Sequence, residues 1–266
     1  MKCLINLRKK RPPVSQTRGT KPIHGKNINE KKFEANKKKF ENLQANFDIM
    51  RPFGPRIARI QCPTVITDKM IEMTDKIMED KEHVSWGSHL VGQIKEEPLI
   101  TKESLIEEGV YDFFNGVLRH YLLNVLKELY DYTEENYTLE TAVKDMWSVH
   151  MEPGGEYNPL HYHTFCHIST VMYLKVPTRR PKRNIPNKAD RDGNIEFVDH
   201  AAWPESLDRG TLVIEPTVGT LWMWPAQLLH TVYPFLGEEE RRSIAWNGVF
   251  RLTEKKSGNI IIGGNP

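Results

Sequence analysis

The sequence contains few cysteines and no long apolar run. Its 266 residues include three cysteines, Cys3, Cys62 and Cys166. Their odd number and wide spacing exclude a disulfide framework and a CxxC-type zinc site. No apolar run approaches the ~20 residues that cross a bilayer, and the first ten residues lack the apolar stretch of a signal peptide. We therefore expect a soluble, cytoplasmic chain without membrane contact.

Basic residues are concentrated at the N-terminus. Residues 1–50 hold 13 Lys and Arg against 4 Asp and Glu, which leaves 24 basic and 31 acidic residues for the rest of the chain. The first 45 residues are also poor in apolar side chains, so we expect a basic, disordered and solvated tail. Contact of this tail with nucleic acid is the alternative, but no recognition module accompanies it.

The remaining chain has the length of a single domain, which we place at residues 46–256, with a short C-terminal tail at 257–266. Helical periodicity predicts supporting helices within residues 67–135, one beginning at Thr67 as its N-cap and a longer one that Gly109 and Gly116 divide. An extended segment at 56–61 precedes them. From residue 141 to 252 the pattern changes to short strands between Pro and Gly, without strand–helix alternation: 143–151, 168–176, 194–198, 211–214, 220–224, 229–233 and 243–252. This order favours an α+β protein, mainly β, with an antiparallel sandwich or barrel supported by N-terminal helices.

Two histidines with metal-ligand spacing stand in the segment Asn158-Pro-Leu-His161-Tyr-His163. Residues i and i+2 of an extended strand project from the same side, so both imidazoles are able to hold one ion. His230, at the start of a later predicted strand, supplies a third imidazole. Three imidazoles suit Fe(II), Zn, Cu or Ni, and the ligand type alone does not choose among them. The alternative is that these histidines are surface residues or hydrogen-bonded core residues.

Arg241 follows His230 by eleven residues and is separated from Ser243 by one. In a strand both side chains face the same way, and together they suit a carboxylate, while Arg242 points to the opposite side. The alternative is that the two arginines simply pair with the acidic turn at 238–240.

The ordered set of motifs resembles the Fe(II)/2-oxoglutarate-dependent oxygenases, most closely those related to the prolyl-hydroxylase branch. The resemblance covers roughly residues 140–252, and its motifs are His161-x-His163, Ser169-Thr-Val-Met-Tyr-Leu-Lys-Val-Pro177, Gly193-Asn-Ile-Glu-Phe, Gly219-Thr-Leu-Trp-Met-Trp-Pro225, His230-x-Val-x-Pro234 and Arg241-x-Ser-Ile-Ala-Trp-Asn247.

The resemblance implies a double-stranded β-helix (jelly-roll) core and a hydroxylation that releases succinate and CO2, with ascorbate as a reductant. It assigns His161, His163 and His230 to Fe(II) and Arg241 to the far carboxylate of 2-oxoglutarate. Ser243 adds a donor to that carboxylate, and Tyr173 either binds it too or fills the core. Trp222 and Trp224 either line the pocket or pack in the hydrophobic core.

One position departs from the family pattern. The usual ligand set is two histidines and a carboxylate, whereas position 163 is histidine and leaves the metal without an anionic protein ligand. The nearby carboxylates of Glu156, Glu196 and Asp199 are not at ligand spacing.

Two other functions remain open from the sequence. One is a three-histidine metal dioxygenase that needs no 2-oxoglutarate, and the other is a non-catalytic binding protein on the same scaffold. The substrate, a small molecule or a protein side chain, is not specified by any motif.

Overall fold

The computed structural model describes residues 54–178, 181, 185–199 and 210–264. The predicted basic tail at 1–45 and the domain boundary near residue 46 lie outside these ranges. None of the helices in the described ranges combines the length and apolar character needed to cross a bilayer.

The first helix begins earlier than the sequence predicts. It is α2, Thr64–Glu79, and Pro63 precedes it directly. Pro63 is the N-cap: its ψ of 141° is extended, and its carbonyl oxygen accepts the backbone N–H groups of Ile66 and Thr67, so the helix begins at Thr64. The expectation that Thr67 is the N-cap is wrong, because Thr67 lies buried one turn inside the helix.

The longer helical stretch is divided once. The two helices are α3, Lys102–Glu107, and α4, Tyr111–Tyr130, with Gly109 at a φ of +73° between them. Glycine adopts this left-handed conformation without a Cβ clash, so the division at Gly109 is confirmed. The expected break at Gly116 is wrong, since this residue lies inside α4.

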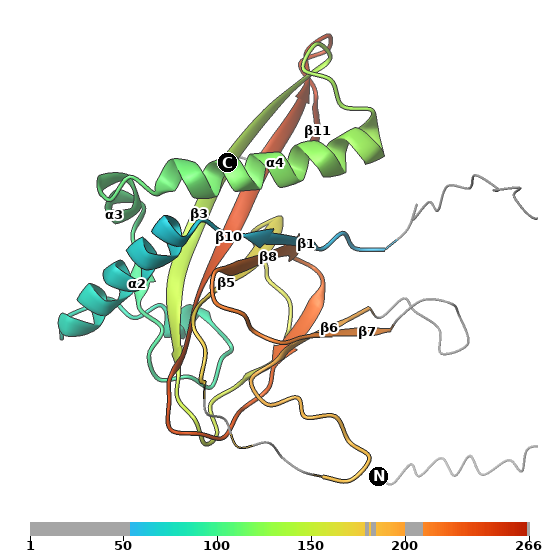
Figure 1. Cartoon of the computed structure of the whole chain (residues 1–266). Coiled ribbons are helices and arrows are strands. Elements are labelled where there is room, and N and C mark those ends of the chain that lie inside the picture. Colours follow the sequence, from blue (N-terminus) through green and yellow to red (C-terminus); the bar gives the residue numbers. More distant parts are fainter. Residues whose placement is uncertain (1–53, 179–180, 182–184, 200–209, 265–266) are drawn as a thin grey trace, which may run out of the picture. The chain divides into compact units, whose positions relative to one another are not determined.

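Two antiparallel sheets form the core of the described residues (Figure 1). The larger sheet has the order β1-β8-β5-β10-β3-β2, with β11 paired to β10, and the smaller sheet has the order β4-β9-β6-β7. The strands are β1 Ala58–Gln61, β2 Leu99–Ile100, β3 Tyr137–Met151, β4 Asn158–His161, β5 Ile168–Lys175, β6 Ile195–Val198, β7 Thr211–Ile214, β8 Thr220–Pro225, β9 Leu229–Val232, β10 Arg241–Glu254 and β11 Ile260–Gly263. This mainly β arrangement with supporting helices is the double-stranded β-helix that the resemblance implies.

Strand β10 separates two hydrophobic clusters. It pairs along its whole length with β3 and also with β5, and successive side chains alternate between its two faces. Ile244 and Trp246 pack with α4 residues such as Phe114 in one cluster. Tyr173 and Trp224 belong to the second cluster, together with residues of the smaller sheet. The helices therefore cover one face of the larger sheet, and the other face is left for the cavity described below.

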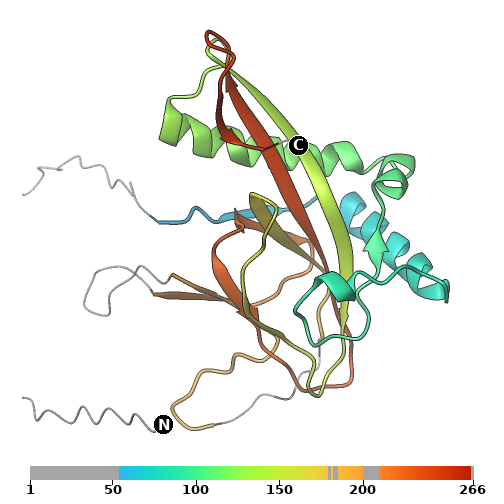
Figure 2. The same ribbon diagram turned by 180° about the vertical axis from the view of Figure 1, so that it is seen from behind.

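Several short elements were not predicted. Strand β11 lies within the expected tail at 257–266 and pairs with β10, so that part of the chain is not a tail. A loop before β2 contains the 3-10 helix η1, Gly87–His89. Isolated bridges join this loop to residues 150 and 157, beside β3 and β4 (Figure 2, teal).

Candidate metal and cosubstrate site

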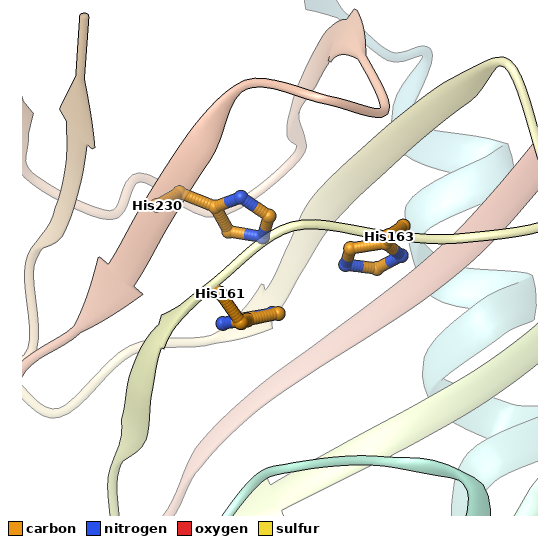
Figure 3. Close-up of side chains that lie close together, drawn as sticks. All are labelled: His161, His163 and His230. Carbon is orange, nitrogen blue, oxygen red and sulfur yellow. The ribbon is translucent and has the colours of Figure 1, made fainter. Parts of the chain in front are cut away.

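The structure brings the three predicted histidines together. His161 ends β4 and lies directly opposite His230 of β9 in the strand register. His163 follows β4 in a loop rather than in the strand, where its backbone N–H donates to the carbonyl of Ala226. Ring nitrogens from all three residues lie within 4.8 Å of one another, and Figure 3 shows the rings gathered from these separate segments.

Each ring has an oxygen partner at Nδ1. His161 Nδ1 lies 2.7 Å from the carbonyl oxygen of Pro159, and His230 Nδ1 lies 2.9 Å from that of Leu228. His163 Nδ1 lies 2.9 Å from Oδ1 of Asn247. These oxygens only accept, so each neutral ring carries its proton on Nδ1 and keeps the Nε2 lone pair, as metal-ligating histidines do.

Burial keeps the three rings neutral. It lowers the pKa of His163 to about 4, against a smaller opposing effect of the Asn247 hydrogen bond. Burial also lowers the pKa of His161, and it lowers that of His230 well below the ordinary value. Because metal binding requires unprotonated imidazole, the cluster is ready for an ion at neutral pH.

A cavity of about 590 Å³ contains this cluster. Its wall includes every second residue of the first half of β10, namely Arg241, Ser243, Ala245 and Asn247. The period of two predicted that Arg241 and Ser243 face the same way, and the structure confirms it. Trp224 also lines the cavity and packs edge-on against His230, with ring centroids 5.0 Å apart, whereas Trp222 is not part of the wall.

Arg241 is buried without a carboxylate partner. It is 2% exposed, its Nε donates to the carbonyl oxygen of Gly193 at 3.2 Å, and Nη2 has no partner among the described residues. Its guanidinium carbon lies 5.0 Å from the ring centre of Tyr173, whose buried hydroxyl is likewise unpartnered. Ser243 lies opposite Tyr173 in the β10–β5 register. Buried polar groups are normally satisfied, so these free donors indicate a site for an anion.

Arg242 has the opposite surroundings. Its Nη1 lies 2.5 Å from Asp75 of α2, and its Nε and Nη2 bond to the two carboxylate oxygens of Glu240 at 2.7 and 2.9 Å. Pairing with the acidic turn, which the sequence left as an alternative for both arginines, therefore applies to Arg242. Arg241 forms no such pair within the described residues.

No carboxylate of the described chain joins the histidine cluster. Glu156 accepts the backbone N–H groups of Lys95 and Glu152, and Glu196 bonds to Arg191 and Tyr233. The donor set is therefore three neutral imidazoles.

Two polar residues of the cavity with a candidate role, Asn247 and Glu97, were not predicted from the sequence. Asn247, which orients His163, continues the alternation of Arg241 and Ser243, so the period of two would have found it. Glu97 lies in the loop before β2 and lines the cavity, but it belongs to no motif and no periodic run. Only the packing of that loop against the sheets brings it there.

Comparison with known proteins gives one family. Residues 145–247 match the model of the family described as "Putative 2OG-Fe(II) oxygenase", where 2OG is 2-oxoglutarate. The match includes the three histidines, Arg241, Ser243 and Asn247. No curated protein matches the chain.

Solved structures show more distant similarity. A prolyl-4-hydroxylase from Pseudomonas putida is 15% identical, over 74% of this chain and 92% of that one, with a TM-score of 0.46. A prolyl hydroxylase from Trichoplax adhaerens, in complex with a peptide of the hypoxia-inducible-factor oxygen degradation domain, is 12% identical over 73% and 83%, with a TM-score of 0.42. AviO1 from Streptomyces viridochromogenes Tue57 is 10% identical over 73% and 89%, with a TM-score of 0.45.

Proposed function

We propose that this chain, which belongs to the 2OG-Fe(II) oxygenase family through residues 145–247, hydroxylates a C–H bond of its substrate. As a member of that family it is an oxidoreductase that uses Fe(II) and 2-oxoglutarate. In the proposed reaction one oxygen atom of O2 enters the substrate and the other enters succinate, while CO2 leaves the oxoacid. The observation that carries the proposal is one cavity that contains three converging imidazoles and a buried guanidinium without a carboxylate partner among the described residues.

The histidines fit the metal through their hydrogen bonds. With every Nδ1 directed to an oxygen acceptor, we assign Nε2 of His161, His163 and His230 to Fe(II). Neutral imidazole is a suitable ligand for Fe(II), although this donor set lacks the usual carboxylate. The charge that such a carboxylate supplies elsewhere must here come from 2-oxoglutarate or from groups farther away.

The oxoacid fits the polar groups at the side of Arg241. We assign the far carboxylate of 2-oxoglutarate to Arg241, with Ser243 and the Tyr173 hydroxyl as additional donors. The unpartnered Nη2 and hydroxyl support this assignment, because a carboxylate would satisfy both. A three-histidine dioxygenase without an oxoacid would need this cation only for a carboxylate of its own substrate, so the response to 2-oxoglutarate separates the two functions.

The protein's own part in the reaction is to orient and to exclude water. Bound Fe(II) and 2-oxoglutarate supply the oxidising power. Trp147 stacks on His163 and Trp224 packs on His230, so both rings are held in place. Apolar side chains, among them Val171, Ile195 and Val232, form further parts of the wall. A dry wall protects the reacting centre from water and strengthens the attraction between Arg241 and a carboxylate.

Anaerobic titration tests the proposal. We expect Fe(II) and 2-oxoglutarate together, and neither alone, to give a visible charge-transfer absorption with the full chain, and His230→Ala to abolish it. Addition of O2 should then yield succinate in a slow, substrate-independent reaction. An absorbing Fe(II) complex that ignores 2-oxoglutarate would favour the three-histidine dioxygenase, and no metal binding would favour a non-catalytic binding protein.

Location and partners follow from weaker observations. We propose a cytoplasmic protein, because the chain has three cysteines and the two described ones, Cys62 and Cys166, are free thiols. We propose a small molecule or a protein side chain as substrate. For the basic residues 1–45 the prediction stays a solvated tail, with nucleic-acid contact as the alternative.

A further inference from the structure

Glu97 is a buried carboxyl group on the wall of the same cavity. It is 2% exposed, and its Oε2 has no hydrogen-bond partner among the described residues. A buried carboxylate without a partner costs several kcal/mol, so such groups are normally paired with a cation or a donor. Glu97 therefore needs an explanation that the metal and oxoacid assignments do not provide.

Backbone hydrogen bonds fix Glu97 in this position. Its own carbonyl oxygen accepts the N–H of Trp86 at 2.7 Å. The residues on either side, Glu96 and Pro98, accept the N–H groups of His150 and Ser148 at 3.0 Å. Three successive carbonyl groups are thus tied down, two of them to β3. These bonds fix the backbone of residue 97 beside β3, so its side chain starts from a defined position at the cavity wall.

The space beside Glu97 holds a second polar side chain. A Cβ added to Gly92 would lie 2.6 Å from Oδ1 of Asn158 and 3.2 Å from Oε1 of Glu97, so the two side-chain oxygens lie close to each other beside this glycine. Asn158 also lines the cavity. The neighbouring side-chain oxygens of Glu97 and Asn158 are acceptors, so they favour a ligand group with several N–H donors.

The cations already present in the cavity are committed elsewhere. Arg241 is assigned to the oxoacid, and Lys144 donates to the carbonyl of Phe165 and pairs with Asp145. No described Lys or Arg lowers the pKa of Glu97; burial, followed by the negative charge of Glu156, raises it to about 7. Among the residues that the structure describes, Glu97 thus has no cationic partner, which leaves its carboxyl group for a cationic group of a ligand.

The rest of the cavity wall includes aromatic side chains that suit the stem of such a ligand. Trp86 and His89 are in contact, with ring centroids 4.3 Å apart, and both line the cavity together with Tyr162 and Phe165. Phe165 is 89% exposed and adopts a φ of +58°, which is strained for a side chain of this kind. Aromatic faces attract ammonium and guanidinium groups as well as alkyl chains.

We propose that the substrate carries a protonated amine or guanidinium group, which Glu97 binds together with Asn158 while the aliphatic stem passes the aromatic side chains. The proposal rests on the proposed function, because it assigns the substrate class of that same cavity. It makes Glu97 a specificity-determining residue and not a metal ligand.

A pair of probes that differ in charge tests the proposal. The full chain is loaded with 2-oxoglutarate and with Zn(II) in place of Fe(II), so that no turnover occurs, and binding is followed by ligand-observed NMR. The probes are the blocked amides of lysine and of 6-hydroxynorleucine, in which a hydroxyl replaces the ammonium group. We expect the lysine probe to bind roughly tenfold tighter or more, because its hydrogen bonds to a carboxylate are charge-assisted.

Variants identify the group that causes the preference. Glu97→Gln should reduce the ratio of the two affinities to about one. Glu97→Asp, which keeps the charge but withdraws it by one methylene, should retain part of the preference. Glu107→Gln on the exposed end of α3 is the matched control and should keep the full ratio. Zinc stoichiometry and the melting temperature show that each variant is folded.

Three outcomes overturn the inference. The first is equal binding of the two probes, or no binding of either, by the loaded wild-type protein, and the second is a preference that survives in Glu97→Gln. The third is weaker zinc binding by Glu97→Gln with an unchanged ratio, which would mean that Glu97 balances the charge of the metal. Failure of the proposed function is distinct from all three, because the wild-type chain would then not bind zinc and 2-oxoglutarate.

Discussion

Adjacent arginines on β10 show the difference between the two faces of the larger sheet. Arg242 faces the helices, and its guanidinium is bonded to Asp75, Glu240 and Thr74. Arg241 faces the cavity, where its Nε donates to the carbonyl oxygen of Gly193 and no carboxylate of the described residues contacts it. Both are nearly fully buried, so burial alone does not distinguish a structural cation from one that awaits a ligand. The hydrogen-bond partners of each guanidinium distinguish the structural cation from the one that awaits a ligand.

Two glutamates repeat the comparison. On the helix side, Glu240 is bonded to His150 and Arg242; although burial opposes ionisation, these bonds lower its pKa to about 2. On the cavity side, burial raises the pKa of Glu97 to about 7. The charges on the helix side are paired with one another and stabilise the fold, whereas those on the cavity side are unfavourable until a ligand binds. Substitutions on the two faces should therefore affect different measurements.

The largest expected effect on stability is that of Arg242→Met. Removal of the cation takes one partner each from Glu240 and Asp75, and we expect a cost of about 3 kcal/mol of unfolding free energy, at the low end for a buried pair because the Asp75 side chain is 47% exposed. Urea denaturation followed by tryptophan fluorescence measures it. Arg56→Met, which removes the more exposed pair with Glu128, is the control and should cost less than about 1 kcal/mol. Equal losses in the two variants would contradict the comparison.

Arg241→Met should affect binding instead. We expect the affinity for 2-oxoglutarate to fall roughly fiftyfold to a hundredfold, about 2.5 kcal/mol, because a charge-assisted contact to the carboxylate is lost. The unfolding free energy of the ligand-free protein should stay the same or rise, since the removed cation has no carboxylate partner. Titration of the Fe(II) protein with 2-oxoglutarate measures the first quantity and urea denaturation the second. A loss of stability like that of Arg242→Met would place Arg241 among the structural residues.

Asn247→Leu should weaken metal binding without removing a ligand. The amide oxygen of Asn247 fixes the proton of His163 on Nδ1, and a partner of this kind is worth about 10- to 100-fold in metal affinity. Competition with a chelator measures the affinity. His167, whose Nδ1 accepts the backbone N–H of Phe250 outside the cluster, gives the control His167→Gln, which should leave metal binding unchanged. An unaltered metal affinity in Asn247→Leu would show that Asn247 does not support metal binding.

The sequence predicted the parts of the site that follow a period or a motif. Alternation along one strand placed Arg241 and Ser243 on the same face and Arg242 on the other, which the contacts of the two arginines confirm. The spacing of His161 and His163 predicted two rings on one side, although β4 ends before His163. These residues lie close together in the sequence, so their relative orientation follows from the period of the strand alone.

What the sequence could not give depends on contacts between distant segments. Glu97 reaches the cavity only because its loop bonds to β3, fifty residues later in the chain. Thr67 was expected from the sequence to be the N-cap of the first helix, but α2 begins at Thr64 with Pro63 as its N-cap, because Thr67 has the residue type of a cap and yet its position is decided by burial inside the fold. Strand β11 depends on pairing with β10, and its short apolar run resembles many terminal segments.

The smallest expected effect is a difference between wild type and Glu97→Gln in the pH dependence of the unfolding free energy. The folded-state pKa of Glu97, about 7, lies above its unfolded value, so the protonated carboxyl stabilises the fold fully below pH 4.5 and loses that contribution as the pH rises through 7. Glutamine does not titrate, so the variant should match wild type near pH 4.5 and exceed it at pH 8. We expect a difference of about 1 kcal/mol, less than the full pKa shift implies, because solvent screening reduces the cost of a charge that faces an open cavity. Urea denaturation at the two pH values measures it. A saturating cationic ligand should remove the difference by stabilising ionised Glu97, and a variant less stable than wild type at pH 8 would show that Glu97 already has a partner within the chain.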